Sequence, residues 1–145
     1  MTAVVKEKSV GIVLFHVPSQ RVLMLHSIGN AGWVFPKGHP HDHESDLQAL
    51  LRELEEETGL TFNSHREHIQ PLTIVRHQFM GREGLIKKDV MYYYLVLSGD
   101  LPEACVHDHD HDDLYWWPLA EATRIPYKYA ADQTVLRALS EELRK

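Results

Sequence analysis

The pattern of hydrophobic and polar positions divides the chain into short strands and helices. Five runs rich in β-branched and other apolar residues are separated by turn-forming residues, which indicates strands; the runs are Val10–Phe15, Arg21–His26, Leu72–Phe79, Val90–Leu97 and Leu114–Trp117. By contrast, Leu47, Leu50, Leu51 and Leu54 recur at the i, i+3, i+4 and i+7 spacing of an amphipathic helix, which Gly59 is placed to end.

A second helix is predicted over about residues 131–143, with Val135, Leu136 and Leu139 on its buried side. Between the early strands and the first helix, glycines and prolines mark a long irregular loop, and residues 81–84 are predicted to form a turn. The order strands, loop, helix, strands, helix predicts an α/β domain with a mixed β-sheet between helices. The length of 145 residues fits a single domain over residues 1–145.

Charge and composition limit the class of function. The net charge is −6, from 15 basic and 21 acidic residues, so no strong nucleic-acid binding is expected. The single Cys105 excludes an internal disulfide and favours a reducing compartment. The longest apolar run, Val90–Leu97, is shorter than the roughly 20 residues of a membrane helix. We therefore expect a soluble cytoplasmic protein, as a monomer or a homodimer.

Three carboxylates of the first predicted helix share one face. Glu53, Glu56 and Glu57 stand at i, i+3 and i+4, and Arg52 is the only Lys or Arg between positions 44 and 60. Each acidic group in the last helical turn costs ~0.3–1 kcal/mol against the helix dipole. The face is either an ordinary solvated surface or a site for a hard cation such as Mg²⁺ or Mn²⁺, which carboxylate oxygens suit.

The same region resembles the Nudix box. All nine defined positions of the pattern are present: Gly38, Glu44, Arg52, Glu53, Leu54, Glu56, Glu57, Gly59 and Leu60. The resemblance implies a Nudix-type α/β/α sandwich whose box, residues 38–60, is a loop, a helix and a second loop. It further implies that Glu53, Glu56 and Glu57 bind Mg²⁺, for which Mn²⁺ can substitute, with the backbone carbonyl of Lys37 as a further ligand. Hydrolysis of a phosphoanhydride bond would follow, with Glu57 or Glu53 as the base.

The resemblance also gives other box residues structural roles. Glu44 and Arg52 would hold the loop on the helix by hydrogen bonds and charge pairing, and Gly38 and Gly59 would supply backbone conformations that other residues resist. One departure from the pattern is His43, which stands where relatives usually carry glycine, so the loop is expected to turn differently.

Outside the box, three stretches look like the asymmetrical diadenosine tetraphosphate hydrolases of the Nudix family. They are Trp33–His39, Lys88–Tyr92, and His109–His111 followed by Trp116 and Leu119–Ala122. This likeness implies cleavage of diadenosine tetraphosphate to ATP and AMP. The alternatives are another Nudix pyrophosphatase, acting on a nucleoside triphosphate, on ADP-ribose or on the 5′ end of RNA, and a non-catalytic nucleotide sensor.

The likeness also implies roles for single residues. His39 and Lys88 would contact phosphates, and Tyr92 would belong to the substrate-binding strand. Tyr129, or Tyr127 in its place, would stack on a nucleobase. Asp110 would assist the metal, although it is one methylene shorter than the usual glutamate.

Each of these residues also has a plainer interpretation. Lys37 and Lys88 are solvated lysines in most proteins, and alternation along a strand buries one face of Tyr92–Tyr94 as core. Trp33, Trp116 and Trp117 are expected to pack rather than react. The alternating tract His107–Asp113 is predicted to be an acidic loop over the active site, with a regulatory metal site as the lesser alternative.

Overall fold

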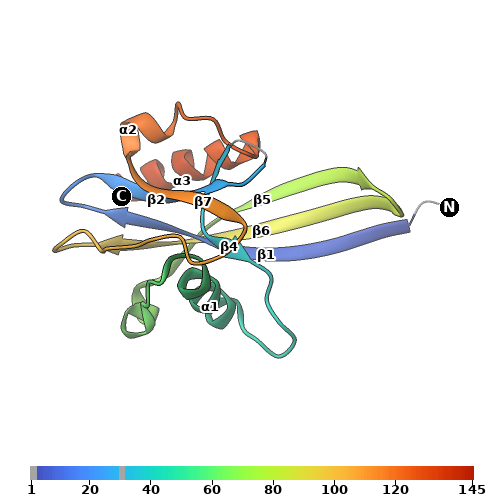
Figure 1. The fold of residues 1–145 in the computed structure, drawn as a ribbon, viewed down its shortest axis with the longest axis horizontal. Helices are drawn as coiled ribbons and strands as arrows, with labels where there is room; N and C mark the ends of the chain where they lie inside the picture. The colour runs from blue at the N-terminus through green and yellow to red at the C-terminus, as the bar shows by residue number, and fades with distance from the viewer. Residues whose placement is uncertain (1–2, 30–31) are drawn as a thin grey trace.

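One mixed sheet organises the computed structural model, which describes residues 3–29 and 32–145 (Figure 1). Its seven strands within those ranges are β1 (Ala3–His16), β2 (Arg21–Ser27), β3 (Gly32–Val34), β4 (Lys37–Gly38), β5 (Gln70–Gly81), β6 (Gly84–Leu97) and β7 (His111–Pro118). The order is β3-β2-β1-β6-β5, with β4 paired to β1 and β7 to β2. Only β1 and β6 pair in parallel among these described strands, so the predicted mixed sheet is confirmed.

Helices cover both faces of the sheet. Helix α1 (Asp46–Thr58) lies on one face, and α2 (Leu119–Ala122) and α3 (Gln133–Leu143) lie on the other (Figure 1). Two 3₁₀ segments, η1 (Asn63–His68) and η2 (Ala130–Asp132), complete the described elements. This arrangement confirms the predicted α/β/α sandwich. Across the described residues, every helix is too short or too polar to cross a membrane.

The core has two layers, one on each side of the sheet. Alternate residues of β1 point to opposite layers, so that Ile12 packs with Leu54 of α1 while Val13 packs with Leu136 of α3. All four side chains are at most 1% exposed. Because both faces are buried, the central strands are apolar on both sides, and for this reason their sequences are continuous hydrophobic runs.

The strands β1, β5 and β6 extend together beyond the rest of the sheet (Figure 1). β1 and β6 stay in register from the pair Ala3 and Gly84 to the pair His16 and Leu97. The sequence-predicted strands were therefore too short, because backbone pairing continues through polar residues that carry no hydrophobic signal. The turn predicted over residues 81–84 is confirmed, with Gly81 paired to Gly84 across the hairpin.

Helix α1 begins and ends as its sequence predicts. The Ser45 hydroxyl accepts from the Gln48 backbone N–H while the Gln48 side chain accepts from the Ser45 N–H, which is a capping box. At the other end Gly59 adopts φ +77° and donates its N–H to the Glu55 carbonyl. This termination leaves the last turn of the helix, with its carboxylates, at the edge of a pocket.

Candidate active site

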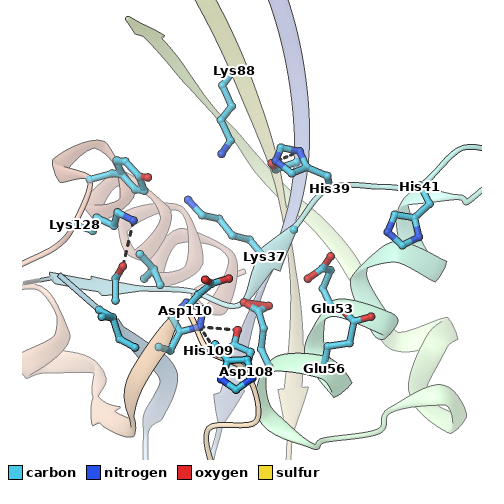
Figure 2. Close-up of a pocket in the computed structure, with 18 residues that line it drawn as sticks. Lys37, His39, His41, Glu53, Glu56, Lys88, Asp108, His109, Asp110 and Lys128 are labelled. Carbon is cyan, nitrogen blue, oxygen red and sulfur yellow. Dashed lines mark hydrogen bonds and ion pairs between the residues drawn. The ribbon is translucent and has the colours of Figure 1, made fainter. Parts of the chain in front are cut away.

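A pocket of about 690 Å³ lies between α1, β4, the loop before β7 and the segment before α3 (Figure 2). Its acidic wall carries three α1 carboxylates together with Asp108 and Asp110. Its basic wall carries Lys37, Lys88 and Lys128. Carboxylates and ammonium groups thus face a shared space, which suits a polyanion together with cations.

The three carboxylates of α1 line this pocket but differ in exposure. The Glu57 residue is only 5% exposed, the Glu53 side chain is 18% exposed, and that of Glu56 is 55% exposed. Glu55 points to solvent and does not line the pocket. The helical spacing therefore predicted the shared face correctly, while the depth of each group depends on the packing around it.

Arg52 holds the loop before α1 against the helix. Its Nε lies 2.8 Å from Glu44 Oε2, its Nη1 lies 2.9 Å from Glu53 Oε1, and its Nη2 donates to the His39 carbonyl at 2.9 Å. The Arg52 hydrogen bonds lower the pKa of Glu44 to about 2, and the Glu44 carboxylate raises the pKa of Arg52. Glu44 and Arg52 thus hold the loop on the helix, which is the structural role that the resemblance implied for them.

Two backbone positions shape the loop. A Cβ at Gly38 would collide with the Glu53 carboxylate, so a side chain here would displace that carboxylate from its present position. His43 adopts φ +67°, a left-handed conformation that glycine reaches at low cost. His43 therefore occupies a conformation that favours glycine, at a cost in backbone strain.

Glu57 is the most perturbed carboxylate of the site. Burial first, and then the charges of Glu53 and Asp108, raise its pKa to about 9, while the neighbouring Lys37 backbone opposes the shift only in part. Its Oε2 is buried without a hydrogen-bond partner among residues 3–29 and 32–145. A divalent cation would satisfy this oxygen and favour the ionised carboxylate, so these residues fit a metal ion with oxygen ligands.

The basic wall converges on Tyr129. Lys37 Nζ lies 4.4 Å and Lys128 Nζ 5.4 Å from the centre of the Tyr129 ring, and Lys128 also donates to Ser27 Oγ at 3.1 Å. Burial lowers the pKa of Lys37 to about 8, and the charges of Lys88 and Lys128 act in the same direction. An anion bound here would stabilise all three ammonium groups.

Beneath this wall lies a buried carboxyl group that sequence analysis missed. Asp132 is fully buried, burial raises its pKa, and its Oδ1 lies 3.9 Å from His77 Nε2. Its negative charge favours protonated Lys37. Lys128 was missed as well, because neither residue belongs to a motif and both reach the site through long-range packing.

Of the predicted substrate residues, three line the pocket and one does not. His39, Lys88 and Tyr129 line it together, from the box loop, β6 and the segment before α3. Tyr92 is fully buried, with its ring 5.7 Å from that of Phe35. The prediction that Tyr92 contacts substrate is thus corrected: its face of β6 points into the core beneath α3.

The remaining aromatic candidates pack as expected. Tyr127 donates its hydroxyl to the Ala122 carbonyl and packs against the core, so that Tyr129 and not Tyr127 faces the pocket. Trp116 is buried in the layer beside α1, whereas Trp33 and Trp117 meet edge to face at 5.2 Å in the other layer. The structure confirms packing roles for the tryptophans.

The histidine-aspartate tract forms one side of the pocket. Asp108, His109, Asp110 and His111 all line it, as predicted for an acidic loop over the site. Among them, Asp108 and His111 form the metal-compatible group with Glu57, and Asp110, the predicted ligand, is not part of that group in the described residues.

Backbone hydrogen bonds fix the tract at the end of α1. The His107 N–H donates to the Glu57 carbonyl at 3.0 Å, and the Cys105 N–H donates to the Thr58 carbonyl at 3.3 Å. A Cβ at Gly59 would collide with the His107 ring, so this glycine serves the contact as well as the helix end. The tract and the last turn of α1 are therefore one packed unit.

Comparison with known proteins agrees with this architecture. Residues 5–139 match the NUDIX domain. Over 120 residues the chain is 29% identical to the RNA pyrophosphohydrolase of Stenotrophomonas maltophilia, covering 75% of this chain and 56% of the relative. Over 75 residues it is 37% identical to the mRNA-decapping protein g5R of African swine fever virus, covering 52% of this chain and 29% of that protein. The chain thus spans about half or less of the length of these curated relatives.

Solved structures share the fold at low sequence identity. The NUDIX domain of Shewanella oneidensis NrtR, complexed with ADP ribose, superposes with a TM-score of 0.75 and 24% identity, covering 99% of this chain and 90% of that chain. A C. elegans Ap4A hydrolase in a binary complex gives 0.69 and 22%, covering 95% and 98%. Because the NUDIX match extends over nearly the whole sequence and includes the intact box, the chain belongs to the Nudix domain family.

Proposed function

We propose that this protein is a divalent-metal-dependent pyrophosphohydrolase that cleaves diadenosine tetraphosphate to ATP and AMP. The observation that carries the proposal is one pocket in which the box carboxylates of α1 face Lys37, Lys88 and Lys128. The carboxylates suit metal ions, and the lysines suit the phosphates that those ions activate.

Glu53, Glu56 and Glu57, with the backbone carbonyl of Lys37, would hold Mg²⁺, for which Mn²⁺ can substitute. When bound, the ion neutralises phosphate oxygens and makes an attacking water more acidic. We assign the base to Glu57, because Glu53 Oε1 is held by Arg52, whereas Glu57 Oε2 is unpartnered among the described residues. With a cation bound, the Glu57 carboxylate would be ionised and could accept a proton from the attacking water.

The basic wall would bind the phosphate chain. Lys37, Lys88 and Lys128 supply three positive charges, and His39 adds a ring nitrogen at the box side of the pocket. These groups orient the chain so that one phosphorus lies beside the carboxylates. Tyr129 would stack on a nucleobase, which contributes ~1–3 kcal/mol.

A second cavity supports a substrate with a nucleoside at each end. It has a volume of about 450 Å³, shares Lys37, Lys88 and Tyr129 with the main pocket, and continues to His77 and Phe79 on β5. Phe79 is 49% exposed and offers an apolar ring to a base. A dinucleoside polyphosphate would use both cavities, whereas a nucleoside triphosphate would use one.

The second candidate substrate is RNA with a 5′-terminal triphosphate. It is favoured by the 29% identity to the Stenotrophomonas RNA pyrophosphohydrolase. The same lysines would bind its phosphates, and the same carboxylates would serve hydrolysis of one of its phosphoanhydride bonds. The net charge of −6 weighs against extended contact with an RNA backbone.

The chain's composition supports a cytoplasmic location and a single Nudix domain over residues 1–145. Cys105 is a free, exposed thiol, which is typical of a reducing compartment. The family match over residues 5–139 leaves little of this sequence outside the domain.

A substrate panel with Mg²⁺ in ¹⁸O-labelled water tests the proposal. The panel contains diadenosine tetraphosphate, ATP, ADP-ribose and RNA with a 5′-triphosphate. We expect the fastest turnover for diadenosine tetraphosphate, giving ATP and AMP, and the product that carries the label identifies the attacked phosphorus. Faster turnover of another compound would reassign the substrate. Tight nucleotide binding without any product, under Mg²⁺ or Mn²⁺, would instead indicate a nucleotide sensor.

A further inference from the structure

Three metal-compatible side chains meet beside the box carboxylates. Glu57, Asp108 and His111 each offer one donor atom, and these atoms all lie within 4.8 Å of one another. Glu57 lies in the last turn of α1, Asp108 belongs to the loop before β7, and His111 begins β7. Figure 2 shows Asp108 on the side of the pocket nearest the end of α1. Only the fold brings these three groups together, since the box motif contains just one of them.

A second observation points to a ligand at this cluster. The Glu57 residue is more than nine-tenths buried, and its Oε2 has no hydrogen-bond partner in residues 3–29 and 32–145. Asp108 pairs with His111 Nδ1 at 2.9 Å, but that ion pair leaves Glu57 unsatisfied. The partly buried contact between Asp108 and His111 would therefore explain two of the three groups, and a bound cation explains all three.

We propose that Glu57, Asp108 and His111 form a cation site distinct from the helix set, and that this site takes a divalent transition-metal ion of the Mn²⁺ or Zn²⁺ type in preference to Mg²⁺. The reason is the donor set. Imidazole nitrogen suits transition ions, whereas Mg²⁺ prefers oxygen donors and retains its waters. The inference rests on the proposed function only in that Glu57 belongs to both sets of ligands.

The placement also revises the role of the histidine-aspartate tract. Asp110 and His109 line the same pocket, yet the described donor group contains neither. The tract would then contribute one specific pair, Asp108 and His111, and the surrounding histidines and aspartates would supply only charge and polarity.

Electron paramagnetic resonance of Mn²⁺ bound to the full, metal-stripped chain tests this site without substrate. Pulsed measurements detect a ligand nitrogen through its ¹⁴N coupling to the ion. We expect ¹⁴N coupling in the wild type and in His109→Asn, the matched control at a pocket histidine outside the group. His111→Asn should lose the coupling and bind Mn²⁺ about tenfold or more weakly, with little change in Mg²⁺ affinity.

A second pair of variants separates the two aspartates. Asp108→Asn should weaken Mn²⁺ binding as His111→Asn does, while Asp110→Asn should retain it; the reverse result would return the ligand role to Asp110 and overturn the site. Circular dichroism checks that each variant is folded. Absence of ¹⁴N coupling in the wild type would refute the inference outright, whatever the variants do. The resonance measurement uses no substrate, so its result is independent of the substrate panel. Hydrolysis in the panel without ¹⁴N coupling to Mn²⁺ would refute this site alone. Coupling without hydrolysis in the panel would refute only the proposed function.

Discussion

At the scale of single residues, the three glutamates of the box have the same side chain but lie in different surroundings. Glu53, Glu56 and Glu57 have the same chemistry and share a helix face, yet Glu57 alone among them is buried, with a pKa raised to about 9. Its neighbours Asp108 and the Lys37 backbone come from other parts of the chain. The motif therefore predicts which glutamates matter, and the packing determines what each one does.

Glu57→Gln should reduce kcat for diadenosine tetraphosphate by about 10²-fold or more, because it removes the proposed base and one metal ligand. Hydrolysis at saturating Mg²⁺ measures the effect. The matched control is Glu55→Gln, which makes the same exchange on the solvent face of α1 and should leave kcat unchanged. Near-normal activity in a folded Glu57→Gln protein would rule out the mechanism.

Phe79→Ala should raise KM for diadenosine tetraphosphate by about tenfold, which corresponds to the loss of one base stacking on an aromatic ring. KM for ATP should not change, since a single nucleoside does not require the second cavity. Met80→Ala is the control, because Met80 is exposed on the same strand and does not line that cavity. Equal effects of Phe79→Ala on both substrates would show that the second cavity does not hold a distal base.

Alternation along β6 also illustrates a limit of residue-level prediction. Successive side chains of a strand alternate, so Tyr92 and Tyr93 point to opposite faces of the sheet. Helices cover both of those faces. Sequence alone could not decide which tyrosine would be core. The structure buries Tyr92 fully, while the Tyr93 hydroxyl donates to Asp46 at 3.1 Å.

At the scale of elements, local sequence signals predicted helix α1 but missed the short strands that form only by pairing with their neighbours. The helix bounds follow from the Ser45 capping box and from Gly59, both readable in the sequence. The strands β3 and β4 are two or three residues long and exist because β2 and β1 pair with them. Such short strands have no hydrophobic period, so their prediction requires knowledge of the sheet.

His43→Gly should stabilise the protein by about 0.5–1 kcal/mol, because glycine adopts the φ of +67° without the strain that a side chain imposes. The gain is measured as a rise in the midpoint of urea unfolding. His41→Gly makes the same exchange at a loop residue without a positive φ and should lower stability, since the unfolded chain gains freedom. A loss of stability in His43→Gly would show that the side chain contributes more than its strain costs.

At the scale of the whole molecule, the pocket joins walls that are remote in sequence. The acidic wall comes from α1 and the tract before β7, and the basic wall comes from β4, β6 and the segment before α3. The α/β/α layers could be predicted from the order of elements. The tract that carries Asp108 was expected over the site, but the meeting of Lys128 with the box could not be predicted, because a long-range contact of this kind leaves no pattern along the chain.

Charge buried in this pocket should make stability depend on pH in the metal-free protein. The folded-state pKa of Glu57 is about 9 against an ordinary 4.5, so the folded protein holds a proton that the unfolded chain releases. Stability should therefore fall as pH rises from 5 to 8, with a contribution from this group of at most about 1.4 kcal/mol per pH unit. Above pH 8 the lowered pKa of Lys37 acts in the opposite direction.

Urea unfolding in EDTA at pH 5.5, 7 and 8 measures this slope. Glu57→Gln should show a shallower slope than the wild type, because glutamine does not titrate. Added Mg²⁺ should also flatten the wild-type slope, since the cation favours the ionised carboxylate. Parallel slopes for the two proteins in EDTA would show that Glu57 is not the group responsible.

The two backbone bonds from the tract to the end of α1 make the site observable by hydrogen exchange. The amide protons of Cys105 and His107 are held by the Thr58 and Glu57 carbonyls, so they exchange with deuterium when the tract separates from the helix. An ion shared by Glu57 and Asp108 would have to leave, or lose a ligand, in the same event. Mn²⁺ should therefore slow these two amides and leave the distant Arg144 amide, bonded to Glu141, unchanged. The lifetime of the bound metal would then be limited by how often this short stretch of backbone opens.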